Sequence, residues 1–295
     1  MKRTAFLEHV AWTGAGIAYS LGSGGLMMGR AVASAPSDAI EFVQISDSHI
    51  GFAQAANPDV AGTLRMAVDA INAMASQPAF VVHTGDITHL SKPEQFGDAR
   101  AILSGLRAPL IALPGEHDAL GNDLRPYFTT FKIPEATPGG WASWERNGVH
   151  YVALINVFNF EKMGLLGTEQ LDWLAKDLAG VGRGTPVVVF THVPLYALYP
   201  QWGWTTEDGT KALALLQPFD RVTVLNGHIH QIVTHQEGNI RFASAQATAY
   251  PQPKPGSAPK PGPVTLPRND LLHAIGYRTV EIDSSRVGFE DRPLG

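Results

Sequence analysis

The sequence predicts an α/β fold with a metal site on its loops. After Pro36, apolar segments of strand length alternate with segments of helical periodicity, which is typical of a largely parallel, buried sheet. Acidic and histidine residues follow five of the apolar segments, where each predicted strand ends. The carboxyl ends of parallel strands form the crevice of an open α/β sheet, so we expect these side chains to meet there.

Six apolar segments rich in Val, Ile and Phe are predicted as strands: 39–45, 79–84, 109–113, 149–157, 186–191 and 221–226. Helices are predicted at 60–74, 91–106 and 168–178; in the first, Val60, Leu64 and Val68 share one face. Shorter strands at 232–235, 240–245 and 277–282 have no helices between them and are predicted to be antiparallel. The segment 251–267 holds seven prolines, which predicts an extended or mobile loop and not a packed element.

Length, charge and composition exclude several classes of protein. A chain of 295 residues with 44% hydrophobic residues can bury one large core or two small ones. A net charge of −5 without a run of Lys and Arg argues against a nucleic-acid partner. The absence of cysteine excludes disulfides, thiolate metal sites and cysteine nucleophiles.

The first 35 residues have the composition of an export signal. Lys2 and Arg3 precede an uncharged stretch, 10–28, that is rich in Gly and Ala and is followed by small residues. We therefore predict a signal peptide cleaved after Ala33 and a periplasmic protein with no stable membrane association after cleavage. The basic pair also resembles a twin-arginine signal, although Lys replaces the first Arg. An uncleaved anchor is the alternative, because the stretch is almost long enough to span a bilayer.

Seven residues of types that bind metal ions well follow the predicted strands. They are Asp47, His49, Asp86, Glu116, His192, His228 and His230. A single Asp-x-His is weak evidence, but five such clusters at strand ends form a strong pattern. Carboxylates and imidazoles suit Mn, Fe, Zn, Ni or Co, and three carboxylates with four imidazoles could hold two ions side by side. Such a pair suits the hydrolysis of phosphate esters.

The same clusters resemble, in order, the motifs of calcineurin-like metallophosphoesterases, including the class III cyclic-nucleotide phosphodiesterases. The motifs are Asp47-Ser48-His49, Gly85-Asp86, Gly115-Glu116-His117-Asp118, Thr191-His192 and Gly227-His228-Ile229-His230. The resemblance covers about residues 39–283. It implies a domain, 36–295, that forms a four-layer αββα sandwich of two mixed sheets with helices outside. It also implies a dimetal site at the carboxyl ends of the strands.

The resemblance also implies a role for each site residue. Asp47, His49 and His230 would hold the first metal, and Glu116, His192 and His228 the second, with Asp86 bridging both through its two oxygens. His117 would stabilise or protonate the leaving oxygen, and Asp118 would orient His117. The implied reaction is in-line attack on phosphorus by a hydroxide that bridges two divalent or mixed-valence ions, without a covalent phosphoenzyme.

Glu116 departs from the family pattern, which has Asn at this position. One more negative charge about 5 Å from a phosphate costs roughly 3 kcal/mol at an effective dielectric near 20, and about twice that for a dianionic monoester. The expected substrates are therefore small phosphodiesters, such as cyclic nucleotides or glycerophosphodiesters. The alternatives are a phosphomonoesterase or nucleotidase, and a non-catalytic metal- or phosphate-binding protein detuned by Glu116.

Other histidines and aromatic residues have plainer interpretations. His83 is predicted to be a buried structural residue. His89, where purple acid phosphatases carry a tyrosine ligand, is predicted to face solvent, with ligation as the alternative. Four aromatic residues follow His192 in the loop 193–207: Tyr196, Tyr199, Trp202 and Trp204. They could stack on a nucleobase or aryl group at the pocket mouth, pack the loop onto the body or face a partner subunit.

Overall fold

The computed structural model of the protein describes residues 20–22, 25–27, 40–120, 124–158, 164–282 and 287–295, which fall into two compact units. In the first unit, Met1–Ala39, the described residues are an antiparallel pair of short strands, β1 (Ser20–Gly22) and β2 (Gly25–Met27). The cleavage site predicted after Ala33 lies outside the described residues. The second unit, Ile40–Gly295, carries all the elements described below.

The first sheet of this unit has five strands in the order β13-β12-β3-β4-β5. Its strands are β3 (Ile40–Ile45), β4 (Phe80–Thr84), β5 (Leu110–Leu113), β12 (Gly276–Ile282) and β13 (Val287–Pro293). β3, β4 and β5 are parallel, whereas β12 runs antiparallel to β3, and β13 to β12. The first sheet is therefore mixed, with its parallel strands ending at one edge.

The second sheet has six strands in the order β10-β11-β9-β8-β7-β6. They are β6 (Ala142–Arg146), β7 (Val149–Ala153), β8 (Val187–Phe190), β9 (Val222–Asn226), β10 (Val233–Glu237) and β11 (Ile240–Ser244). β7, β8, β9 and β11 are parallel, and β6 and β10 are the antiparallel edge strands. This sheet is mixed as well.

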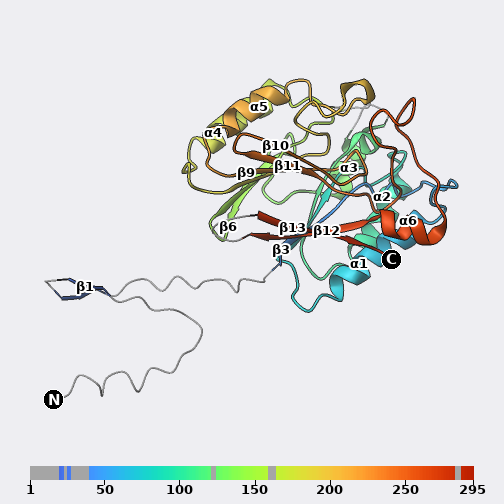
Figure 1. The fold of residues 1–295 in the computed structure, drawn as a ribbon, viewed down its shortest axis with the longest axis horizontal. Coiled ribbons are helices and arrows are strands. Elements are labelled where there is room, and N and C mark those ends of the chain that lie inside the picture. The colour runs from blue at the N-terminus through green and yellow to red at the C-terminus, as the bar shows by residue number, and fades with distance from the viewer. Residues whose placement is uncertain (1–19, 23–24, 28–39, 121–123, 159–163, 283–286) are drawn as a thin grey trace, which may run out of the picture. The chain divides into compact units, whose positions relative to one another are not determined.

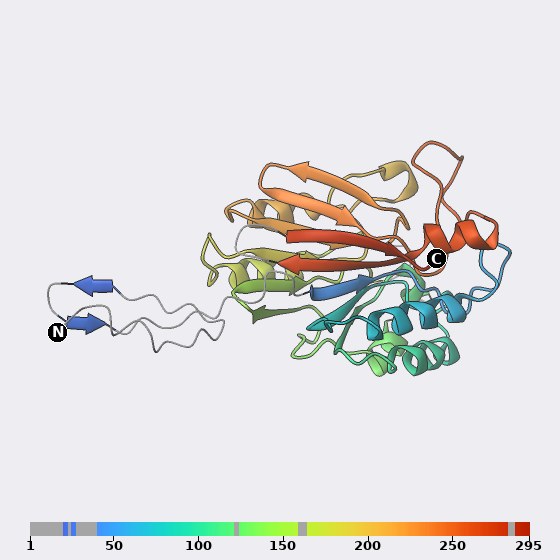
Figure 2. The same cartoon turned by 60° about the horizontal axis from the view of Figure 1, so that its bottom comes forward.

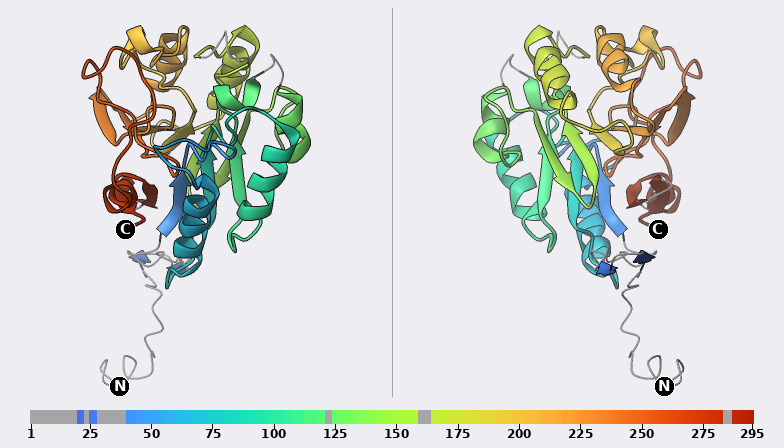
Figure 3. Two further views of the ribbon diagram at one scale, coloured as in Figure 1. Left: turned by 90° about the vertical axis from the view of Figure 1, so that its right-hand side faces the viewer. Right: turned by 90° about the vertical axis from the view of Figure 1, so that its left-hand side faces the viewer.

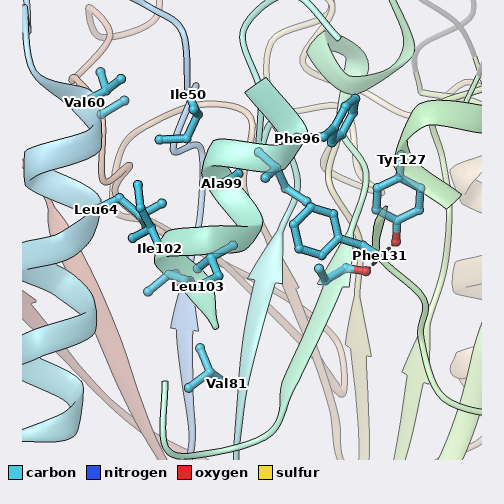
Figure 4. Close-up of a cluster of buried hydrophobic side chains, with 14 of the residues drawn as sticks. Ile50, Val60, Leu64, Val81, Phe96, Ala99, Ile102, Leu103, Tyr127 and Phe131 are labelled. Carbon is cyan, nitrogen blue, oxygen red and sulfur yellow. Dashed lines mark hydrogen bonds between the residues drawn. The ribbon is translucent and has the colours of Figure 1, made fainter. Parts of the chain in front are cut away.

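Helices cover the outer faces of both sheets, which makes four layers. Figures 1 and 2 show α1 (Val60–Asn72) and α2 (Pro93–Leu103) beside the first sheet, and their buried side chains pack on β3, β4 and β5 together with α3 (Arg125–Thr130). Figure 4 shows this cluster, with Leu64 of α1 near Ile102 of α2 and Phe131 beside Tyr127. On the opposite side, α4 (Thr168–Leu178) and α5 (Gly209–Leu216) pack on the second sheet (Figures 1 and 3). The predicted αββα sandwich is confirmed.

The inner faces of the two sheets enclose a core rich in aromatic rings. Phe42 of β3 stacks on Phe80 of β4, with ring centroids 5.0 Å apart, and meets Phe190 of β8 edge to face at 5.3 Å. Tyr151 of β7 and Trp144 of β6 extend the same cluster across the second sheet. This core holds the sheets face to face, so that the carboxyl ends of their parallel strands lie at a common edge.

The prediction that the later strands are antiparallel is correct for β10 and β12 but wrong for β11. β11 pairs antiparallel with β10 and parallel with β9, because the chain crosses to the sheet edge as β10 before it returns. Burial explains the order. The side chains of Phe242 and Ala243 point to opposite faces of β11 and both are buried, which suits an interior strand. β10 carries His235, Gln236 and Glu237, which suit an edge strand. The antiparallel edge strands β6 and β13 escaped prediction.

The proline-rich segment contains no helix or strand, as predicted, but it is packed against the body. Gln231 donates from Nε2 to the carbonyl oxygens of Gln252 and Pro253, at 3.2 and 2.6 Å. Ala258 packs against the side chains of Trp202, Trp204 and Ile229. The short helix α6 (Arg268–Ala274) follows this segment and leads into β12. Among the helices of the described residues, none has the length and apolar character needed to cross a membrane.

Replacing Phe42 with alanine should destabilise the domain, because its ring is fully buried between the sheets. The expected loss in the free energy of unfolding is about 3–5 kcal/mol, the usual cost of deleting a large buried aromatic side chain. Urea denaturation measures it. The exposed Lys176→Ala change in α4 is the control and should alter the free energy by no more than about 0.5 kcal/mol. If Phe42→Ala unfolded at the same urea concentration as the wild type, the result would contradict a core shared by the two sheets.

Candidate metal centre

The seven predicted ligands lie together at the common edge of the two sheets. Each follows the carboxyl end of a parallel strand, and all seven are buried. The first sheet contributes Asp47, His49, Asp86 and Glu116, and the second contributes His192, His228 and His230. The two sheets are joined directly here, because the backbone N–H of His228 donates to both carboxylate oxygens of Asp47, at 3.1 and 3.2 Å.

Three of these side chains form one potential ligand set, the first triad: Asp47, His49 and His230. The Nε2 atoms of His49 and His230 are 3.1 Å apart, and His230 Nε2 lies 3.4 Å from Asp47 Oδ1. All three ligand atoms therefore converge on one small volume. Carboxylate oxygen and two imidazole nitrogens are a suitable donor set for a divalent transition metal.

The second triad, Glu116, His192 and His228, forms another potential ligand set. Glu116 lies between the two rings: Oε2 is 2.7 Å from His192 Nε2, and Oε1 is 2.9 Å from His228 Nδ1. Burial raises the pKa of Glu116, but His228 and His192 outweigh this and hold the pKa well below its usual range. Glu116 is therefore ionised, as a metal ligand must be.

Asp86 lies between the two triads. Its Oδ2 is 3.5 Å from His49 Nε2 of the first triad, and its Oδ1 is 3.5 Å from His192 Nε2 of the second. One carboxylate thus directs one oxygen toward each ligand set, which is the arrangement that a bridging ligand requires.

The residues present fit a pair of cations. In His228, Nε2 is buried without a partner, and the one close polar atom at Nδ1 is the Glu116 oxygen, an ion-pair contact of 2.9 Å without hydrogen-bond geometry. In the first triad, two imidazole nitrogens face each other at 3.1 Å, a contact that needs a proton or a cation between the rings. Buried polar groups without partners are rare in proteins, and metal binding would satisfy them.

Backbone carbonyls fix the orientation of two ligand rings. His192 Nδ1 lies 2.7 Å from the carbonyl oxygen of Thr84, and His230 Nδ1 lies 2.6 Å from that of Tyr250. A ring that donates from Nδ1 to a carbonyl presents Nε2 to the metal, and such support is usual for histidine ligands. Both Nε2 atoms point at the carboxylates described above.

The ligand loops have a strained backbone. Asp47, His49, Asp86, His228 and His230 all have φ between 43° and 68°, in the left-handed region that non-glycine residues rarely adopt. Such strain costs of order 1–3 kcal/mol for each residue and concentrates at functional sites. It persists because hydrogen bonds fix the loops, among them Asp47 N–H to the Gly85 carbonyl at 3.0 Å and His49 N–H to that of Asp86 at 2.9 Å.

Gly115 allows the close approach of the two sheets at this point. A Cβ atom there would lie 2.1 Å from Asp86 Oδ1 and 2.7 Å from His192 Nε2. Gly85 is needed for a second reason, since its φ of +99° suits glycine alone and a Cβ would meet the His192 ring at 2.4 Å. Both glycines therefore make room for ligand atoms.

His117, the predicted proton donor, lies beside Asp86 at the edge of the centre and is partly buried. Its backbone N–H donates to Asp86 Oδ1 at 2.9 Å, and its ring Nδ1 is 2.7 Å from the His89 carbonyl oxygen. Burial lowers the pKa of the His117 imidazole, but Asp86 and Glu116 outweigh burial, so the pKa is raised above its ordinary value. The ring is thus placed to carry a proton next to the centre.

Asp118 has a structural part that we did not expect, and the predicted role of orienting His117 stays a prediction. Its carboxylate accepts hydrogen bonds from the backbone N–H groups of Ile87, Thr88 and Gly115 and from the Thr88 hydroxyl, at 2.8–2.9 Å. The His89 carbonyl oxygen contacts the His117 ring, and the charge of Asp118 helps to raise the pKa of that ring. Burial, with a further contribution from Asp86, raises the pKa of Asp118 to about 6. Asp118 therefore ties the loop after Asp86 to the loop that carries Glu116.

The prediction for His83 is confirmed, and for His89 both stated alternatives stay open. His83 is fully buried between Ser48 and the Gly85 backbone, and burial lowers its pKa to about 3, so it is a neutral structural residue. His89 is partly buried: its ring stacks on His117, with centroids 4.9 Å apart, and His49, His89 and His117 form a further group that could hold a metal ion. His89 Nδ1 lies 3.4 Å from His49 Nδ1, on the side of that ring away from the first triad.

The two tryptophans of the loop after His192 pack onto the body of the protein. Trp202 and Trp204 are buried and meet edge to face at 5.1 Å against Ile229, which lies between two predicted ligands. Of the three alternatives stated for the aromatic residues of this loop, these two tryptophans follow the one in which they pack the loop onto the body. Tyr250 is a residue of the site that escaped prediction; its ring stacks on His49 with centroids 5.0 Å apart. It has no ligand spacing, so no pattern in the sequence marks it.

The chain belongs to the calcineurin-like phosphoesterase family, whose model matches residues 40–232. It is therefore a member of a class of hydrolases whose centre holds two metal ions, in agreement with the two triads that share Asp86.

Individual relatives include two bacterial phosphodiesterases. A glycerophosphodiester phosphodiesterase of Enterobacter lignolyticus is 27% identical over 260 residues, which cover 82% of this chain and 89% of that protein. A probable cyclic nucleotide phosphodiesterase of Rhodococcus erythropolis is 24% identical and covers 71% of each chain. Among solved structures, a dimetal phosphatase from Danio rerio has a TM-score of 0.64 at 14% identity, covering 88% of this chain and 98% of that one. That likeness supports the fold.

Replacing Gly115 with alanine should abolish metal binding, because the new methyl group would overlap Asp86 Oδ1 and His192 Nε2. We expect two metal ions per chain in the wild type and fewer than one in the variant, measured by elemental analysis after dialysis against manganese. The matched control is Gly97→Ala in α2, where nothing lies within 4 Å of the added Cβ. It should keep both ions and gain about 0.5–1 kcal/mol in stability. Wild-type metal content in Gly115→Ala would contradict the site.

Proposed function

We propose that the protein hydrolyses small phosphodiesters at a centre of two metal ions. The observation that carries this proposal is the position of Asp86, whose two oxygens face separate triads of ligands. The names of the relatives support it, since glycerophosphodiester and cyclic nucleotide phosphodiesterases predominate among them. Two cations supply charge neutralisation for phosphoryl oxygens and a water of lowered pKa.

The residues of the chain divide the remaining work between them. Asp47, His49 and His230 bind on one side of Asp86, and Glu116, His192 and His228 on the other. His117 holds a proton at its ring, supported by the His89 carbonyl, and can donate it to the oxygen that leaves phosphorus. Asp118 fixes the spacing of the two loops that carry Asp86 and Glu116.

Manganese, iron, zinc, nickel and cobalt all suit the donor atoms of the two triads, which are carboxylate oxygens and imidazole nitrogens. The chain has no cysteine, so no thiolate biases the choice toward a softer ion. Divalent and mixed-valence pairs are both compatible with this donor set.

The preference for diesters follows from Glu116. Its carboxylate is a third negative charge in the centre, beside Asp47 and Asp86, and its low pKa keeps it ionised. A phosphomonoester carries a second negative charge near neutral pH and is repelled about twice as strongly as a diester. A neutral amide at residue 116 would lift this discrimination.

Glu116→Asn should raise monoester turnover relative to diester turnover by at least about tenfold, because it removes one negative charge whose effect of roughly 3 kcal/mol is offset in part by the metal ions. The measurement is the ratio of kcat/KM for an aryl phosphodiester and an aryl phosphomonoester with manganese added. Glu94→Gln, which changes an exposed glutamate at the start of α2, is the control and should leave the ratio unchanged.

Two outcomes would contradict the proposal. If the wild type cleaves the monoester faster than the diester, the protein is a phosphomonoesterase or nucleotidase. If the wild type is silent and Glu116→Asn is active, the natural protein is a metal- or phosphate-binding protein whose turnover Glu116 has suppressed.

We further propose that the protein acts in the periplasm after loss of an amino-terminal signal. The support is the order of residues at the amino terminus: Lys2 and Arg3, an uncharged stretch and small residues up to Ala33. Periplasmic protein should begin at Ser34, as read by amino-terminal sequencing of the fractionated protein. Arg3→Gln should leave an uncleaved precursor in the cytoplasm. Intact wild-type protein in the cytoplasm would contradict export, and intact protein in the membrane would favour the uncleaved anchor.

A further inference from the structure

Tyr250 lies at the first triad, on the segment between β11 and the proline-rich loop. Its backbone carbonyl accepts a hydrogen bond from His230 Nδ1 at 2.6 Å. The preceding residues are fixed to the strand end that carries Asp47: Ala249 N–H donates to the Asp47 carbonyl at 3.2 Å, and Thr248 N–H to the Ser46 carbonyl at 2.9 Å. The backbone of Tyr250 is therefore positioned as firmly as that of the predicted ligands.

The ring of Tyr250 covers the imidazoles of the first triad. It stacks on His49 with centroids 5.0 Å apart and an interplanar angle of 27°, and it lies 4.8 Å from the His230 ring. Phe52 packs beside it at 4.4 Å. Only 4% of the residue is exposed, so the ring is held between the ligand rings and the apolar side chain of Phe52.

The hydroxyl of Tyr250 has no hydrogen-bond partner among the residues that the structure describes. Another buried tyrosine shows the usual situation, since the Tyr127 hydroxyl donates to the Ala112 carbonyl. Burial raises the pKa of the Tyr250 hydroxyl, and the carboxylates of Asp86, Asp47 and Glu116 raise it further. The hydroxyl is carried by a ring that packs on His49 and His230 of the first triad.

We propose that the Tyr250 hydroxyl binds substrate, by donating a hydrogen bond to a phosphoryl oxygen of the phosphoester held at the two triads. The observations that carry this assignment are the packing of the ring on two residues of the first triad, the hydrogen bonds that fix the adjoining backbone, and a hydroxyl without a partner among the described residues. The ring fixes the donor through its packing on His49 and His230. Because phosphoryl oxygens are charged, the hydrogen bond is of the stronger, charge-assisted kind. The substrate class rests on the proposed function, but phosphate binding does not.

The test is Tyr250→Phe, which removes the hydroxyl and keeps the ring that packs on the two histidines. In the manganese-loaded protein, inorganic phosphate should bind about tenfold more weakly or worse, as measured by calorimetry. The kcat/KM for an aryl phosphodiester should fall by a similar factor, while metal content and melting temperature stay at wild-type values. Tyr196→Phe is the matched control, because the Tyr196 ring packs on His235 and Phe242, outside both triads, and no change is expected.

Either of two results would overturn this role for Tyr250. Wild-type phosphate affinity in Tyr250→Phe would show that the hydroxyl does not reach the bound phosphoryl group. Loss of metal ions in this variant would show that Tyr250 acts through the ligands as a structural or coordinating residue. A wild type that binds phosphate but cleaves no phosphoester would refute the proposed function, and the calorimetric comparison would still decide the role of Tyr250.

Discussion

The structure depends on burying three carboxylates among four imidazoles where two sheets meet. Removing such groups from water is costly unless each is paired, and Asp86, Glu116 and Asp47 each have a partner on the second sheet: His192, His228 and the His228 backbone N–H. The pairing therefore requires both sheets at once. The aromatic core around Phe42 sets their separation, and the narrow gap at Gly115 lets ligand atoms of one sheet reach those of the other.

The local strain follows from the same constraint. Strand ends that deliver ligands to a shared volume have to turn within two or three residues, and five of the seven ligands turn through the left-handed region. A hydrogen bond between strand ends, such as that from Asp47 N–H to the Gly85 carbonyl, offsets part of that cost. Because these bonds join segments far apart in the chain, each loop keeps its strained shape only when the whole edge is assembled.

The sequence was sufficient for features that repeat along the chain and insufficient for those that arise only in three dimensions. Apolar segments followed by Asp or His marked the ends of β3, β4, β8 and β9, and the resemblance supplied the second sheet and the layers. The parallel position of β11 depends on which strand it meets after the hairpin, and no local pattern records that. The sequence alone does not show that the Asp118 carboxylate accepts hydrogen bonds from the backbone of the loop after Asp86. Tyr250 is recognisable as a residue of the site only from the packing of its ring on His49.

The Glu116 carboxylate lowers the net charge of the centre by one unit relative to an amide. Two divalent ions would bring four positive charges to three carboxylates, which leaves a net charge of about +1, whereas an amide at residue 116 would leave about +2. A bound hydroxide would lower both values by one, so the carboxylate in either case leaves the centre one unit less positive, which weighs more against a dianionic monoester than against a phosphodiester anion. Because the site is buried, an unbalanced charge there is poorly screened by water. Glu116 thus offers the donor atoms of a metal ligand, and its charge lowers the net charge that a substrate would meet in the centre.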